Sequence, residues 1–202
     1  AHAQYFGKSY IEETVAPENM DDVLRWTDTM LLAVRDHGLS PPEASRVFGI
    51  GMMAGFVAMN GIGGRYNDSM GFGRGPENGD MLAAYHVATE IALTTAMQRS
   101  FRGFRNRMLN KIPNGEAKTL GMRWGKHVGQ KIAARRARDG SESTKAPYYR
   151  DVMQKRNHVL AWEPTLPVYE SGIGPRIDPF IRPLLPSWGM VDPIGVQDIK
   201  KF

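Results

Sequence analysis

Cysteine is absent from this chain of 202 residues. Its absence excludes disulfide bonds, metal sites built on thiolates and cysteine nucleophiles. No apolar run reaches the roughly 18 residues that a membrane-spanning helix needs, so we predict no membrane span. The chain also lacks an internal repeat, a P-loop, a dinucleotide-binding fingerprint and the alternating pattern of half-buried strands.

The composition is that of an ordinary globular protein, with 42% hydrophobic and 23% charged residues. The length is sufficient for one sizeable core. The start, Ala1-His2-Ala3, is similar to the small-residue pattern at a signal-cleavage site, which favours an exported or periplasmic protein.

Positive charge is concentrated in one segment. From Arg99 to Arg138 there are twelve Lys and Arg residues and one acid, Glu116, so the segment has a net charge of +11, against −6 for the rest of the chain. This asymmetry favours an acidic partner surface or another polyanion, although two helices with solvated basic faces would give the same count. The candidate anion- or partner-binding residues are Arg99, Arg102, Arg105, Arg135 and Arg136.

Apolar spacing and capping residues predict five helices before residue 140. We expect the first from a cap at Asn19 or Asp21 to about 37, and the others at 41–60, 80–99, 100–111 and 116–138. Ser40, Pro41 and Glu43 give the second helix a capping-box start. In the fourth, Phe101, Phe104 and Met108 alternate with arginines, as in proteins that bind single-stranded nucleic acid. Their three- and four-residue spacing, however, favours the core face of an amphipathic helix.

Three glycines recur every fourth residue in the helix at 116–138. Gly121, Gly125 and Gly129 therefore lie on one face. Each costs up to about 1 kcal/mol relative to Ala in a helix interior, so three in register indicate the close approach of another helix. We predict that the chain is organised around this helix, with a proline-stiffened tail laid over it.

The predicted fold class is all-α: a helical bundle with a long proline-rich extended C-terminal segment. We divide the chain into a flexible arm at 1–20, the bundle at 21–140 and an irregular Trp- and Pro-rich segment at 141–202 packed on the bundle. One helix-compatible stretch, 148–158, lies in that last segment. The apolar second helix and the glycine face supply the candidate oligomer or partner interface, formed by Met52, Met53, Phe56, Gly121, Gly125 and Gly129.

Several motifs occur in an order that resembles a known family. They are Pro41-Pro42-Glu43-Ala44-Ser45-Arg46, the three glycines with Arg135-x3-Asp139-Gly140, Trp162-Glu163-Pro164-Thr165 and Leu185-Pro186-Ser187-Trp188-Gly189. Together they resemble the vanadium-dependent haloperoxidases, which belong with the phosphatidic-acid-phosphatase-type acid phosphatases. The resemblance covers about Asp21 to Gly189 and departs at Leu166, where the family often has Pro. It implies a helical bundle whose relatives bind vanadate or phosphate.

The oxyanion motifs of that family are missing. They are Lys-x6-Arg-Pro, Pro-Ser-Gly-His and Ser-Arg-x5-His-x3-Asp, which supply cations, donors and histidines to an oxyanion. In this chain Pro175 stands where a Lys should precede Arg182-Pro183. Trp188 follows Pro186-Ser187, and Met52 stands where a His should follow Ser45-Arg46. We therefore expect no catalytic residue, metal or cofactor in this chain, and vanadate only if a partner chain supplies the site.

The resemblance implies the amino-terminal half of such an enzyme, standing alone. The first hypothesis is a non-catalytic subunit or structural protein that assembles as a homo- or hetero-oligomer. The alternative is one half of a split haloperoxidase or acid phosphatase whose oxyanion site lies on a partner chain. A further alternative, a polyanion- or nucleic-acid-binding protein, depends on the basic segment alone.

Overall fold

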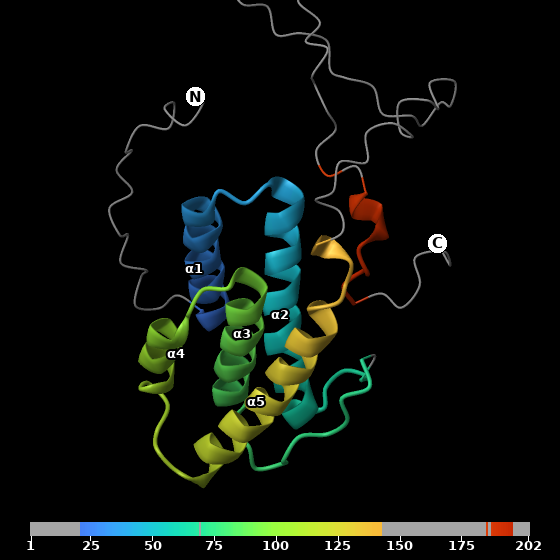
Figure 1. Ribbon diagram of the computed structural model, residues 1–202. Helices are drawn as coiled ribbons and strands as arrows, with labels where there is room; N and C mark the ends of the chain where they lie inside the picture. The colour runs from blue at the N-terminus through green and yellow to red at the C-terminus, as the bar shows by residue number, and fades with distance from the viewer. Residues whose placement is uncertain (1–20, 69, 143–184, 186, 196–202) are drawn as a thin grey trace, which may run out of the picture. The chain divides into compact units, whose positions relative to one another are not determined.

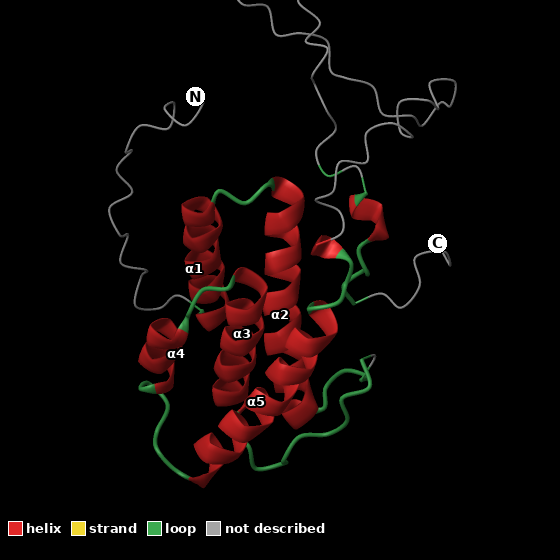
Figure 2. Ribbon diagram, in the orientation of Figure 1, coloured by secondary structure: helices red, strands yellow, loops and turns green. Residues whose placement is uncertain are grey.

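The computed structural model describes residues 21–68, 70–142, 185 and 187–195, and no β-strand lies among them. The helices in chain order are α1 (Asp22–His37), α2 (Pro41–Gly63), α3 (Met81–Met97), α4 (Arg102–Leu109) and α5 (Glu116–Arg136), followed by a short 3-10 helix, η2 (Trp188–Met190) (Figures 1 and 2). The predicted all-α fold class is therefore confirmed. The predicted arm at 1–20, the stretch at 148–158 and the motif at 162–165 lie outside the described residues.

The chain divides into two compact units, Ala1–Leu39 and Ser40–Phe202. In the first unit, α1 begins where Asp21 Oδ1 accepts the Val23 N–H at 2.7 Å. It ends at Gly38, whose φ of 59° is favourable for glycine. The buried face of α1 is formed by Trp26, Met30 and Ala33.

The second unit contains α2 to α5. Two of these helices, α2 and α3, start at capping residues: the Glu43 carboxylate accepts the Ser40 N–H at 3.0 Å, and Asp80 Oδ1 accepts the Ala83 N–H at 2.7 Å. These contacts satisfy donors that a helix start would otherwise leave unpaired. Side chains of acidic and hydroxyl residues thus set where α2 and α3 begin.

The central helix of this unit is α3, which corrects the prediction that the chain is organised around the helix at 116–138. Every residue from Ala83 to Glu90 is buried, because α2, α4 and α5 all pack on α3. In contrast, α5 leaves its basic side exposed. Figure 1 shows α5 running obliquely across α2 and α3.

The glycine face of α5 lies directly on the backbone of α3. A Cβ atom at Gly121 or at Gly125 would overlap a carbonyl oxygen of α3, and one at Gly129 would lie 2.9 Å from such an oxygen. The three carbonyls also recur every fourth residue, at Asp80, Ala84 and Ala88. The close helix approach indicated by the glycine spacing is therefore present, and it occurs within the chain.

The end of α2 is three residues later than predicted, at Gly63 instead of Asn60. Tertiary packing explains the extension. The Trp124 ring covers Gly61, where a Cβ atom would lie 2.6 Å from it, and the Trp124 indole N–H donates to the Ala58 carbonyl at 2.9 Å. These contacts keep the last turn of α2 helical, although its glycines, Gly61 and Gly63, are unfavourable in a helix.

Of the described helices, α2 is long and apolar enough to cross a membrane, with a mean hydropathy of 1.2 over its best window. The core helix of a soluble protein meets the same criterion. Here α2 packs on α3 and α5 and contributes Ile50, Ala54 and Ala58 to the main hydrophobic core. Its composition is compatible with the predicted absence of a membrane span.

Replacing Gly125 by Ala should destabilise the protein by about 1–3 kcal/mol, and replacing it by Leu should cost at least as much, because each added side chain overpacks the α3 backbone. The matched control is Gly103→Ala in α4, where an added Cβ meets no atom within 4 Å. That control should stabilise by up to about 1 kcal/mol through helix propensity. Thermal and urea unfolding measure both effects, and a melting temperature that rises for Gly125→Ala would contradict the close-packing account.

Candidate functional site

Arg46 of α2 meets two charged side chains, Arg136 and Asp139, at the end of α5. The Arg46 Nε–H donates to Asp139 Oδ2 at 2.6 Å, and Arg136 Nη2 lies 2.7 Å from the same oxygen. Arg46 also donates to the Arg136 carbonyl at 2.9 Å. The Asp139 side chain is 1% exposed, and those of Arg46 and Arg136 are 14% and 10% exposed. We call these three residues the ion cluster.

Desolvation alone would raise the pKa of the Asp139 carboxyl. Hydrogen bonds from Arg46 and Ser141, together with the positive charge of Arg46, outweigh it and hold the pKa below the ordinary value of 3.8. Burial lowers the pKa of Arg136, although Asp139 acts in the opposite direction. The ion cluster is therefore one carboxylate between two guanidinium groups.

The ion cluster also binds the C-terminal part of the described chain. Arg136 donates to the carbonyls of Asp192 and Pro193 at 2.7 and 3.3 Å. The Asp192 N–H in turn donates to the Asp139 carbonyl at 2.8 Å. Next along the chain, Ile194 covers Gly49 of α2, where a Cβ atom would lie 2.7 Å from its side chain. The segment around 192–194 is thus fixed to both α2 and α5.

Two clefts border the ion cluster. One, of about 320 Å³, is lined by Met53, Arg135 and Ile194 among others. The other, of about 360 Å³, is lined by Arg46, Thr95 and residues of the chain just after α5. Most hydrogen-bonding groups of the cluster are engaged within the chain, although the buried Nε of Arg136 has no hydrogen-bond partner among the described residues. The arrangement holds chain segments together, and in the described residues no group of three or more His, Asp or Glu side chains could hold a metal ion.

A third cleft, of about 480 Å³, lies between α4 and α5 above α3. We call it the basic groove. Its apolar lining comes from α3 and α5, and four cationic side chains surround it; the residues are Val87, Ile91, Arg102, Arg105, Thr119, Met122, Arg123 and Lys126. Arg105 is paired with Glu90 at 3.1 Å, whereas Arg102, Arg123 and Lys126 are exposed.

The structure does not bring the five anion-binding candidates together. Arg102 and Arg105 line the basic groove, whereas Arg136 belongs to the ion cluster and Arg135 lies next to it at the C-terminal end of α5. Arg99 lies over the Phe101 ring, with 6.0 Å between its guanidinium carbon and the ring centroid. The candidates therefore divide among three places in the fold.

The interface candidates on α2 have different surroundings. Tyr85 donates its hydroxyl to the sulfur of Met52 at 3.8 Å, and Met53 lines the 320 Å³ cleft. Phe56 is 45% exposed and contacts the Tyr66 ring, with 5.7 Å between centroids. The candidate glycines 121, 125 and 129 are covered by α3 of the same chain. A role of these residues in contacts with another chain stays a prediction.

Reasoning from sequence missed the ion cluster, because Arg46 and Asp139 are 93 residues apart. Both residues belong to motifs quoted for the family resemblance. Two opposite charges in separate motifs were therefore the one sequence feature that could have indicated this ion pair. The basic groove could not be predicted either, because the charge count of the segment includes Arg123 and Lys126 but does not say where they lie on the surface.

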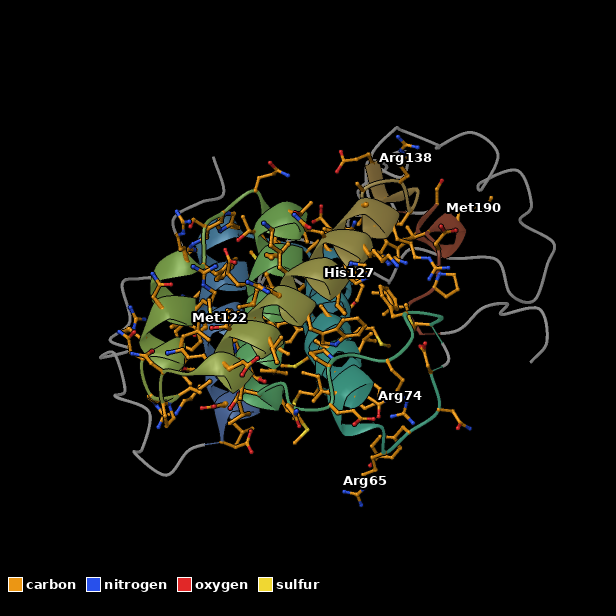
Figure 3. The ribbon with its side chains drawn as sticks, turned by 90° about the horizontal axis from the view of Figure 1, so that it is seen from below. Arg65, Arg74, Met122, His127, Arg138 and Met190 are labelled. Carbon is orange, nitrogen blue, oxygen red and sulfur yellow. The ribbon has the colours of Figure 1, made fainter. Side chains whose placement is uncertain are left out.

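Figure 3 shows Met122, one of the residues that line the basic groove, on the part of α5 that lies toward α4.

Replacing Asp139 by Asn should destabilise the fold by about 3 kcal/mol or more at neutral pH, because two buried guanidinium groups lose their counter-charge. The folded-state pKa of Asp139 lies below its ordinary value. Its contribution is therefore complete above the unfolded pKa and is lost as the pH falls through the folded pKa. The difference in unfolding free energy between parent and variant should shrink below about pH 4, as measured by urea unfolding.

The control is Glu77→Gln in the loop before α3, where the side chain is exposed. It should change the unfolding free energy by less than about 0.5 kcal/mol. A parent-to-Asp139→Asn difference that is the same at neutral and acid pH would contradict the assigned role of the carboxylate.

Comparisons of the chain with protein-family models, with curated proteins and with solved structures give no match.

Proposed function

We propose that this chain is a non-catalytic helical subunit that assembles with a partner protein of acidic surface. The observation that supports the proposal best is the basic side of α4 and α5 and of the turns that follow them. Eight cationic residues there are exposed: Arg102, Arg107, Lys111, Arg123, Lys126, Lys131, Arg135 and Arg138. A surface of one sign repels itself and attracts a partner of the other sign.

The chain itself neutralises two further cations of the same segment. Arg105 pairs with Glu90, and Arg136 pairs with Asp139. The acids that would balance the remainder are scarce in this segment, where Glu116 is the one carboxylate between Arg99 and Arg138. Complementary charge on a second molecule would relieve the repulsion among the exposed cations.

Exposed apolar side chains favour assembly as well. In the second unit Phe56, Met81 and Leu82 are 45%, 44% and 42% exposed. In α1, Leu24 and Leu31 are each 55% exposed, and they lie seven residues apart on one helix face. Large apolar groups exposed in this way are typical of surfaces that another protein covers.

A second candidate function is one half of a split haloperoxidase or acid phosphatase. The observation that favours it is the ion cluster, because Arg46 and Asp139 belong to two separate motifs of the family resemblance and form one buried ion pair. In this candidate the helical half supports an oxyanion site on the partner chain. The two candidates differ in whether the partner carries Lys-x6-Arg-Pro and Ser-Arg-x5-His.

A nucleic-acid-binding role receives less support. Base stacking requires accessible aromatic rings, but Phe101 is buried, with 4% of its surface exposed. The Phe104 ring is covered by Arg107, with 5.5 Å from the guanidinium carbon to the ring centroid.

The chain purified from its native source at low ionic strength should sediment as part of a larger complex. Rising salt should dissociate the complex, because charge attraction is screened within about 10 Å at 0.1 M salt. Sedimentation velocity measures the size, and mass spectrometry identifies the other chains. A single stable species of 22.5 kDa at low salt would contradict the proposal.

The isolated chain should show no vanadate-dependent bromination and no phosphatase activity, since all three oxyanion motifs are missing from its sequence. Steady-state assays with bromide, peroxide and vanadate, and with a phosphate monoester, measure this. Activity of the homogeneous chain would disprove the expectation. Activity that arises only with a partner chain carrying the motifs would support the second candidate.

A further inference from the structure

We propose that the basic groove is a docking site for an acidic amphipathic helix of a partner protein. The inference rests on the proposed assembly function and specifies which surface is used and what chemistry the partner presents. Three features of the groove support it: its apolar lining, the placement of its cations and the absence of aromatic side chains among the described residues that line it.

The lining is apolar and adaptable. Val87 is 4% exposed, and Ile91 and Met122 are half-buried beside it. Methionine has three rotatable bonds and adjusts to irregular partner side chains. The volume, about 480 Å³, falls within the range of about 300–1,000 Å³ of ligand-binding clefts.

The cations come from both neighbouring helices. Arg102 and Arg105 stand three residues apart on α4, and Arg123 and Lys126 stand three residues apart on α5. Residues at this spacing are neighbours on a helix surface. Because Arg105 is already paired with Glu90, the exposed cations are Arg102 from α4 and Arg123 and Lys126 from α5. Apolar residues with cations from two sides are complementary to a helix that has an apolar stripe between acidic residues, the helix-in-groove mode of recognition.

A peptide helix fits these features better than other anions do. Nucleic-acid phosphates could pair with the cations, but they would leave the apolar lining uncovered, and among the described residues no aromatic ring lines the groove for base stacking. An anionic lipid would place its charge at one end of an acyl chain, whereas the cations here stand on two helices. The proposed occupant is therefore an acidic helix. The experiment below also tests whether a nucleic acid or an anionic lipid binds the groove better.

The probe is a fluorescent synthetic peptide of about 16 residues, designed as a helix with leucines at i, i+3, i+4 and i+7 and glutamates on both flanks. The full-length chain should bind it, as measured by fluorescence anisotropy at low salt. A peptide of the same composition, with its leucines distributed around the helix, should bind at least about tenfold more weakly, because it cannot place its apolar side chains together.

Two charge-reversal double variants separate the groove from general charge attraction. Arg123→Glu with Lys126→Glu should weaken binding at least about tenfold. The matched control, Arg65→Glu with Arg74→Glu, makes the same change in net charge at exposed residues outside both the groove and the basic side of α4 and α5 and should stay within about threefold of the parent. Circular dichroism checks that each variant is folded. Met122→Glu adds a charge to the apolar lining and should also weaken binding.

A photoreactive leucine in the peptide locates the contact, and the expected cross-links are to Ile91 or Met122. Equal loss of affinity in the two double variants, or cross-links outside the groove, would overturn the proposal. Displacement of the peptide by oligo-dT or by anionic phospholipid vesicles at lower concentrations than by unlabelled peptide would also overturn it.

Failure of the proposed docking site and failure of the proposed assembly would give different results. If peptide binding does not depend on the groove but the native protein still sediments as a salt-sensitive complex, the docking site is wrong and assembly stands. If the native protein sediments alone while peptide binding depends on the groove, the proposed assembly is wrong and the groove remains a peptide-binding site.

Discussion

The contact between the glycine face of α5 and the backbone of α3 is the constraint on which the rest of the second unit depends. It sets how near α5 lies to α3, at Gly121, Gly125 and Gly129. At this separation the Trp124 indole reaches the Ala58 carbonyl of α2. The same placement of α5 turns its basic residues away from the core and into solvent. One helix–helix contact thus positions both the core and the charged surface.

The ion cluster has a second organising role, at the other end of α5. Asp139 is held by Arg46 from α2, and Arg136 reaches the carbonyls of the C-terminal segment. Buried ion pairs contribute little net stability, because desolvation offsets their attraction, but they penalise any arrangement that separates them. We therefore interpret the cluster as a device that selects one packing of three chain segments.

Local features of the fold could be predicted from the sequence, whereas contacts between distant residues could not. Asp21, Ser40 and Asp80 mark helix starts because capping depends on residues within one turn. The glycine spacing likewise indicated close packing. It could not indicate which helix approaches, and the central helix proved to be α3. The partnership of Arg46 with Asp139 and the basic groove require the relative placement of helices, which spacing along one segment does not specify.

The small residues of the α3–α5 contact have a consequence for binding. Glycine and alanine lose almost no side-chain conformational entropy on packing, and a backbone contact has no alternative rotamers to adopt. The spacing between α3 and α5 is therefore set before any partner arrives. The groove beside this contact, whose lining includes Val87 and Met122, would need little reorganisation to accept a ligand. A preorganised surface retains more of its gross interaction energy as affinity, so a ligand in this groove would lose little of that energy to reorganisation of the protein.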